Sequence, residues 1–104
     1  MDNSSFDNGS ALSKIFGKCK SVYQTKVISD KNTICYYLLK GYVHESGRDT
    51  FGILITESDG EDITDCEFVS DISAVQSGAC RIYDILCRNT VSPCSLFDVL
   101  DDLL

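Results

Sequence analysis

Four stretches in the first two thirds of the chain are rich in β-branched and aromatic residues and are separated by turn residues. They span residues 21–28, 33–44, 50–57 and 63–69. In the first stretch, Tyr23, Thr25 and Val27 would share one face, because side chains alternate between the two faces of a strand. The second stretch is apolar on both faces, which is typical of a central strand. The pattern predicts an antiparallel meander of three or four strands.

Two turns predict the register of this meander. Asp59-Gly60 is typical of a two-residue hairpin between the third and fourth stretches, because the turn needs positive φ. This turn predicts the pairs Phe51–Phe68, Ile53–Cys66 and Ile55–Thr64 on one apolar face. A turn at Ser46-Gly47 predicts the further pairs Tyr42–Phe51 and Leu38–Ile55. It also places Lys40 opposite Ile53, so this lysine must reach the sheet edge, find a partner, or mark a β-bulge.

After Val69 the apolar residues recur every three or four positions, which predicts helices. Ser73 and Gln76 resemble a capping box for a helix over residues 74–88, and Asn89 can adopt the left-handed conformation that ends it. Pro93 prevents continuation, and Ser95 resembles the cap of a last short helix. The apolar stripes of the two helices are Val75, Ala79, Ile82 and Leu86, then Leu96, Val99, Leu100 and Leu103.

Strands that precede helices indicate an α+β domain. We expect an antiparallel three- to four-stranded meander covered on one face by two C-terminal helices. The expected core consists of Phe51, Ile53, Ile55, Phe68, Val75, Ile82, Leu86, Leu96 and Leu100. A chain of 104 residues has room for one such core. Residues 1–10 are polar and without periodicity, which predicts a disordered tail before a single domain over residues 11–104. Residues 10–20 predict a short amphipathic helix or turn.

Composition and charge exclude several classes of function. The net charge is -7, which is the wrong sign for a protein that must bind nucleic-acid phosphates. Residues 1–10 lack the basic start and apolar run of a secretory signal, and no apolar run approaches the roughly 20 residues of a spanning helix. We therefore expect a cytoplasmic protein that binds neither nucleic acid nor membrane.

The residue types needed for catalysis do not form a recognisable motif. His44 is the one histidine, and we expect it to pair across a turn with Asp49 rather than to activate a nucleophile. The glycines form no nucleotide-binding loop, and the acidic residues around Gly60 lack the order of a calcium loop. We therefore assign no catalytic, cofactor-binding or metal-binding residue, and we expect no enzyme activity, no cofactor and no small-molecule substrate.

Six cysteines leave one alternative open. They lie at positions 19, 35, 66, 80, 87 and 94, without the C-x-x-C spacing of zinc or redox motifs. Reduced, buried thiols that behave as small apolar residues are the first interpretation. Cys80, Cys87 and Cys94 could instead form a thiolate cluster, so a redox-responsive or metal-binding protein is the alternative to a non-enzymatic interaction or regulatory domain. A weaker alternative is an acidic mimic that occupies a basic nucleic-acid-binding surface.

The sheet face away from the helices suggests a surface for self-association. In the predicted register it carries Tyr37, Leu39, Val43 and Leu54, which is more apolar surface than a solvated sheet face normally shows. Either residues 12–19 fold back over this face, or a second copy covers it about a two-fold axis. We expect a protein partner, with a homodimer favoured.

Several short segments resemble a family of small proteins of unknown function from Gram-positive anaerobic bacteria. They are Tyr36-Tyr37-Leu38-Leu39, Phe51-Gly52-Ile53, Asp71-Ile72-Ser73 and Val91-Ser92-Pro93, followed by Leu96 and residues 99–104. The resemblance spans residues 33–104 and leaves out the N-terminal 32 residues. It implies a cytoplasmic bacterial protein with strands followed by two helices, and it implies no catalytic residue.

Overall fold

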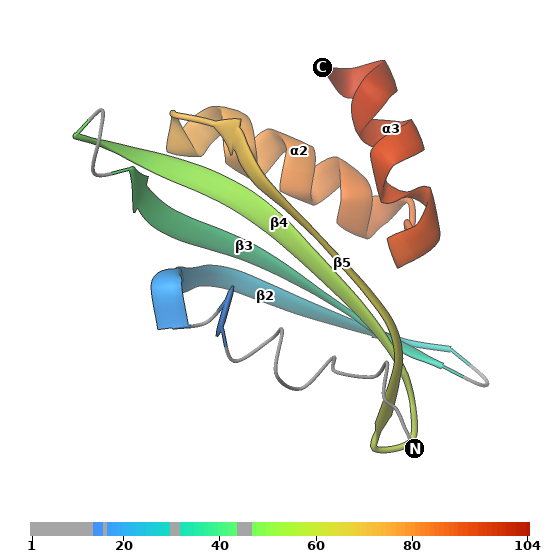
Figure 1. Cartoon of the computed structure of the whole chain (residues 1–104). Helices are drawn as coiled ribbons and strands as arrows, with labels where there is room; N and C mark the ends of the chain where they lie inside the picture. Colours follow the sequence, from blue (N-terminus) through green and yellow to red (C-terminus); the bar gives the residue numbers. More distant parts are fainter. Residues whose placement is uncertain (1–13, 16, 30–31, 44–46) are drawn as a thin grey trace.

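A computed structural model of the chain describes residues 14–15, 17–29, 32–43 and 47–104. Its elements are β2 (Lys20–Ile28), β3 (Thr33–Val43), β4 (Arg48–Asp59), β5 (Asp62–Ser73), α2 (Gln76–Arg88), the 3-10 turn η1 (Pro93–Ser95) and α3 (Leu96–Leu103). The strands form one antiparallel sheet in the order β2-β3-β4-β5. Both helices lie on the same face of this sheet (Figure 1). The structure therefore confirms the predicted α+β meander, with four strands.

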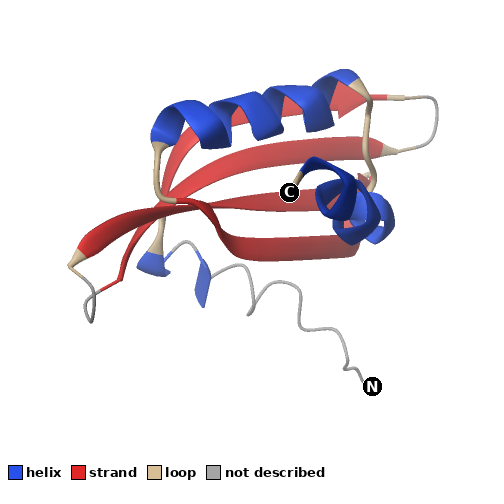
Figure 2. Ribbon diagram, turned by 90° about the horizontal axis from the view of Figure 1, so that it is seen from above, coloured by secondary structure: helices blue, strands red, loops and turns tan. Residues whose placement is uncertain are grey.

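The two helices cover the sheet in different directions. Seen from above, α2 runs along the strands, whereas α3 is seen nearly end-on (Figure 2). Helix α2 packs against β3, β4 and β5, and η1 packs against β4 and β5. Residues 14–15 and 17–18 are helical and lie on the other side of the sheet (Figure 1). The predicted tail over residues 1–10 lies outside the described residues.

The core lies between the sheet and the two helices. Its buried side chains from the sheet include Tyr36, Leu38, Phe51, Ile53 and Ile55, and those from the C-terminal segment include Ala79, Leu86, Leu96 and Leu100. Ile82 packs against this core as a partly buried residue. Two residues of the predicted core lie elsewhere: Val75 is 60% exposed, and Phe68 pairs with Leu54 on the opposite face. The burial of these apolar side chains holds the sheet and the two helices together.

The observed register of β3 against β4 differs from the predicted one by two residues. Leu38 pairs with Ile53, and Lys40 pairs with Phe51. The prediction was wrong because β3 ends at Val43 and β4 begins at Arg48, and these two residues pair with each other. The centre of the connection therefore lies one residue earlier than a Ser46-Gly47 turn would place it. A shift by two residues preserves the face of every side chain, because the period of a strand is two. Lys40 finds a partner, as expected: its Nζ lies 3.5 Å from Oδ2 of Asp49.

The predicted register of β4 against β5 is also wrong. Gly60 and Glu61 form the turn, and Asp59 pairs with Asp62. Gly60 has a φ of +67° and Glu61 has no positive φ, which is the pattern of a type II′ turn. Two bulges follow, between Glu57 and Ser58 and between Phe51 and Ile53. The first bulge shifts the register by one residue, so Cys66 and Phe68 face away from the helices.

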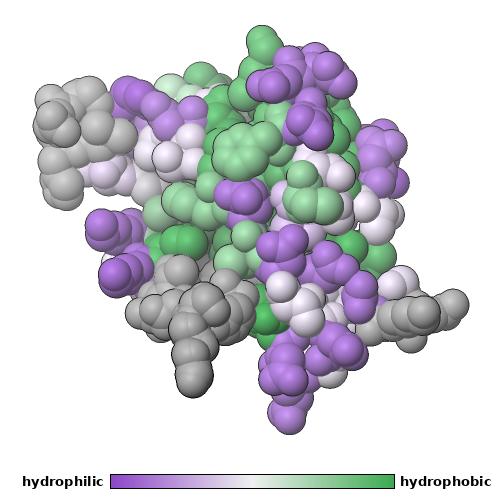
Figure 3. Space-filling model, turned by 45° about the vertical axis from the view of Figure 1, so that its right-hand side comes forward, coloured by the Kyte–Doolittle hydropathy of each residue, from purple (hydrophilic) through white to green (hydrophobic). Residues whose placement is uncertain are grey.

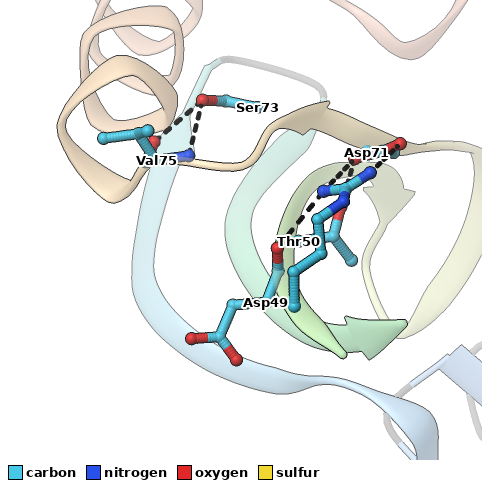
Figure 4. A network of polar contacts seen from close by, with 6 residues as sticks. Asp49, Thr50, Asp71, Ser73 and Val75 are labelled. Carbon is cyan, nitrogen blue, oxygen red and sulfur yellow. Dashed lines mark hydrogen bonds and ion pairs between the residues drawn. The ribbon is translucent and has the colours of Figure 1, made fainter. Parts of the chain in front are cut away.

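The second bulge contains a strained residue that is held by side-chain contacts. Opposite Gly52, β5 bulges outward between Val69 and Ser73, and Asp71 adopts a φ of +56°. The Asp71 carboxylate accepts a hydrogen bond from the Thr50 hydroxyl at 2.5 Å and two from the Arg48 guanidinium at 3.1 and 3.3 Å (Figure 4). The Thr50 hydrogen bond, together with Arg48, lowers the pKa of Asp71 below its ordinary value. These contacts compensate for the backbone strain at the bulge.

The predicted helix caps are wrong at both ends of α2. Ser73 belongs to β5, and its hydroxyl oxygen accepts a hydrogen bond from the Val75 N–H at 3.0 Å. Helix α2 therefore begins at Gln76, with Val75 at the cap position and no side-chain cap. At the other end Asn89 has a φ of -95°, and the left-handed residue is Thr90, with a φ of +49°. The side chain of Ser95 likewise makes no cap to α3.

Candidate functional site

The strand β2 forms one edge of the sheet, and no described strand pairs with its outer side. A bulge interrupts its pairing with β3 between Ser21 and Tyr23, and regular pairing then continues to Ile28. Unpaired N–H and C=O groups along a strand edge can pair with a further strand. The regular part of β2 therefore presents about 20 Å of backbone to a partner.

One tyrosine of α2 connects this helix to β2. The Tyr83 hydroxyl lies 2.6 Å from the Thr25 hydroxyl and donates a hydrogen bond of 3.4 Å to the Tyr36 carbonyl oxygen. The Tyr23 ring lies beside the Tyr83 ring, with 6.1 Å between their centroids. Tyr23, Thr25 and Val27 do share the face that looks toward the helices, because they pair with Leu38, Tyr36 and Ile34.

Between β2 and α2 lies a hollow of about 440 Å³, which we call the β2–α2 groove. It is lined by Tyr23, Ser77, Cys80, Arg81, Tyr83 and Asp84. Tyr23 is 50% exposed, whereas Tyr83 is 8% exposed. The groove therefore has a rigid aromatic floor and a tyrosine on its rim, beside the open edge of the sheet.

The charges around the groove differ from those of the whole chain. Strand β2 carries Lys20 and Lys26 and no acidic residue, in a chain of net charge -7. In the groove, Asp84 forms an ion pair with Arg88 one helical turn later. Arg81 has no hydrogen-bond or ion-pair partner in the described part of the chain. The groove thus presents an uncompensated guanidinium beside a basic strand.

A second hollow of about 420 Å³ adds to this basic character at the start of β2. Its lining includes Lys18, Lys20 and Lys40, together with Asp49. Asp49 is the partner of Lys40, and Lys18 and Lys20 form no ion pair with another described residue. The basic side of the molecule therefore extends along β2 from its first residue.

The tyrosine network is chemically inert at neutral pH. Burial raises the pKa of both Tyr36 and Tyr83 to about 12. Both phenols are therefore protonated near pH 7 and can act only as hydrogen-bond donors or acceptors. The groove itself offers aromatic surface from Tyr23 and Tyr83, the guanidinium of Arg81 and the polar side chains of Ser77, Cys80 and Asp84.

The structure does not bring Cys80, Cys87 and Cys94 together as a cluster. Cys80 lines the β2–α2 groove, whereas Cys94 is exposed in η1 with its Sγ 3.3 Å from the Ser92 hydroxyl. Burial raises the pKa of the Cys87 thiol, as it does for Cys19 and Cys66. A raised pKa reduces the fraction of reactive thiolate. Among the residues described, no group of three or more His, Cys, Asp and Glu side chains could hold a metal ion.

The residues predicted for self-association have different environments. Leu39 and Leu54 are 0% exposed, so atoms of the same chain already cover them. Tyr37 is partly buried, and the side chain of Val43 lies outside the described residues. His44 also lies outside the described residues, and its expected partner Asp49 is paired with Lys40. The homodimer stays a prediction, but these two leucines have no surface to offer a second copy.

Sequence reasoning missed the β2–α2 groove. The pattern placed Tyr23 and Thr25 on one face, yet it could not show which strand lies at the edge of the sheet. Asp84 lies three residues after Arg81 and four before Arg88, so the spacing allows an ion pair with either arginine. Only the structure shows that Asp84 pairs with Arg88.

Comparisons with known proteins give a family but no activity. None of the described helices is long and apolar enough to cross a membrane. No curated protein and no solved structure is detectably similar to the chain. The family of unknown function DUF6514 matches residues 18–104, so the match includes β2, which the resemblance seen in the sequence left out. A family match over this length shows that the chain belongs to the family of unknown function DUF6514.

Proposed function

We propose that this protein is a non-enzymatic, cytoplasmic interaction domain that binds a protein partner in the β2–α2 groove. One observation carries this proposal: the edge strand β2, with no described strand on its outer side, runs beside a hollow that contains the half-exposed Tyr23 and Arg81, which has no ion-pair partner among the described residues. Tyrosine and arginine dominate the binding energy of many protein interfaces, because they combine large apolar area with directed hydrogen bonds. Beneath them Tyr83 forms the floor of the groove, where its hydroxyl group is hydrogen-bonded to Thr25 and to the Tyr36 carbonyl oxygen.

The thiol-dependent alternative has less support. A redox-responsive cysteine needs a lowered pKa and an accessible sulfur. Of the three cysteines of this alternative, Cys87 has a pKa that burial raises, and Cys94 is the exposed one. Titration of the reduced protein with zinc and with a thiol reagent tests this alternative, and zinc uptake or rapid modification near neutral pH would favour it.

Affinity capture from the native cytosol tests the proposed function. The full chain is the bait, and Tyr23→Ala is compared with Phe97→Ala, because the two aromatic side chains are 50% and 53% exposed. Arg81→Glu is compared with Lys14→Glu, which makes the same charge change on an exposed residue outside the groove. A partner that is lost with both groove variants and kept with both controls supports the proposal. A partner lost with Phe97→Ala or Lys14→Glu, and kept with the groove variants, contradicts it.

A second apolar surface makes Phe97 an informative control. In Figure 3, hydrophobic side chains gather on the side of the molecule that carries α3, with hydrophilic side chains around them. The exposed apolar residues of this region are Phe97, Leu103 and Leu104. Loss of a captured partner with Phe97→Ala would therefore place the interface on α3 instead of in the groove.

A further inference from the structure

We infer that the partner binds as an extended segment that pairs with the outer edge of β2 and places an acidic side chain on Arg81. This inference rests on the proposed function, and it adds the conformation and the chemistry of the bound segment. Three features of the described residues support it: the backbone geometry of the edge, the side chains that flank it and the charge around it.

The backbone geometry favours strand addition along residues 23–28. The bulge at Ser21 and Tyr23 twists the first part of the edge, which is one way in which natural proteins block pairing there. From Tyr23 to Ile28 the pairing with β3 is regular, so the outer N–H and C=O groups of this part can form a continuous ladder. Segments bound in this way derive affinity from main-chain hydrogen bonds and specificity from side-chain pockets.

The side chains at the edge are more apolar than a solvated edge strand requires. Tyr23 is 50% exposed and Ile28 is 74% exposed, at opposite ends of the regular part of β2. Tyr23 faces the helices and Ile28, which pairs with Thr33, faces the other way. An added strand would contact both, because its own side chains alternate between the two faces of the sheet. A partner residue facing the helices would enter the β2–α2 groove beside Tyr23.

Charge determines which segment fits. A basic segment would meet Lys20, Lys26 and Arg81, and Asp84, the one carboxylate in the described lining of the groove, is paired with Arg88. An acidic side chain would pair with the guanidinium of Arg81, which has five N–H donors arranged to bind a carboxylate. The occupant is therefore an extended segment of another protein with an acidic residue near an aromatic or aliphatic one.

The probe is a display library of random peptides of about 12 residues, selected on the full chain. We expect enrichment of peptides that combine an acidic residue with an apolar one. Their affinity should fall roughly tenfold for Arg81→Glu and for Tyr23→Ala, and it should not change for Lys14→Glu or Phe97→Ala. Circular dichroism of each variant checks that the fold is intact.

Backbone methylation of a selected peptide separates strand pairing from side-chain binding. N-methyl groups are placed at alternate residues in two peptides of the same sequence, one set at odd positions and the other at even positions. If the peptide adds to β2, one of these peptides loses binding and the other keeps it, because alternate N–H groups of a strand point toward the partner.

Four outcomes would overturn this inference. If both methylated peptides bind equally and the groove variants still lose affinity, strand pairing is wrong and the proposed function stands. If Arg81→Glu does not weaken binding of acidic peptides, the assignment of the acidic side chain is wrong. If no peptide is enriched, or if the full chain forms dimers through β2, the groove does not bind an extended acidic segment of another protein. The proposed function is then still decided by the capture experiment.

Discussion

At Gly52 the backbones of β4 and β5 approach each other so closely that no side chain fits between them. A Cβ atom added there would lie 2.7 Å from the Val69 carbonyl oxygen and 3.2 Å from the Phe68 ring. We expect Gly52→Ala to lower the free energy of unfolding by about 1–3 kcal/mol, because backbone must move to accept the methyl group. Urea denaturation measures the change. Gly17→Ala is the control, since a Cβ there meets no atom within 4 Å, and equal effects of the two substitutions would contradict the close approach.

Asp71 should make stability depend on pH in the acidic range. Its pKa is lowered by the Thr50 hydrogen bond and by Arg48, so the folded state favours the ionised carboxyl. The resulting stabilisation is complete above the ordinary pKa and is lost as the pH falls through the lowered value. We therefore expect Asp71→Asn to destabilise the protein at pH 7, and we expect this difference to shrink between about pH 5 and about pH 2.

Urea denaturation of the wild type and of Asp71→Asn across this pH range provides the measurement. Asp59→Asn is the control, because Asp59 lies exposed at the hairpin and has no ion pair among the described residues. A difference between wild type and Asp71→Asn that stays constant down to about pH 2 would show that the Asp71 contacts do not stabilise the bulge.

At the scale of elements, Tyr83 joins α2 to the sheet through its two hydrogen bonds. Tyr83→Phe removes both and leaves the Thr25 hydroxyl and the Tyr36 carbonyl without this partner. We expect a loss of about 1–3 kcal/mol in the free energy of unfolding at pH 7. Comparison with Thr25→Val and with the double variant isolates the coupling between the two hydroxyl groups. Additive effects of the two substitutions would contradict a direct bond.

The same network predicts sensitivity to alkaline pH. Burial raises the pKa of Tyr36 and Tyr83 to about 12 in the folded state, whereas an unfolded tyrosine ionises near pH 10. The folded state then holds protons that the unfolded state has lost, so stability is full below about pH 10 and falls as the pH rises toward about 12. Burial also raises the pKa of Tyr37. Tyrosine absorbance during an alkaline titration should therefore show one late-ionising phenol fewer in Tyr83→Phe than in the wild type. An unchanged number would refute the assignment.

The strands and helices were predictable from the sequence, whereas the pairing registers of the strands were not. Alternation and turn residues predicted a meander of three or four strands, and the change of period after Val69 predicted two helices. The bulges opposite Gly52 and beside Ser58 depend on contacts between β4 and β5, such as those of Asp71 with Arg48 and Thr50. Such contacts join residues about twenty positions apart and leave no local pattern. Phe68 was therefore assigned to the wrong face, although its strand was recognised.

At the scale of the whole molecule, the candidate site depends on how strands and helices are arranged. In the sequence, nothing distinguishes Tyr23 from the other alternating residues of its strand, or Arg81 from the other charged residues of an amphipathic helix. Only the strand order places β2 at the edge, and only the packing of α2 on β3, β4 and β5 leaves a groove beside it. The uneven charge was visible in the sequence: residues 1–32 hold five Lys against three Asp. What the sequence could not give was the groove that this basic segment borders.

The burial of residues on the sheet face that points away from the helices predicts the oligomeric state. Leu39 and Leu54 are 0% exposed within one chain, and Cys19 contacts this face, since its Sγ lies 3.4 Å from the position of a Cβ on Gly41. Two of the four residues that suggested a homodimer are therefore covered within one chain, and on this ground we expect the full chain to sediment as a monomer at high micromolar concentration. A chain that starts at Ser21 lacks Cys19 and should associate, because the apolar face loses part of its cover. A dimer of the full chain would contradict the expected monomer and would favour a second copy as the cover of this face. A truncated chain that stays monomeric would show that residues before Ser21 are not needed to cover it.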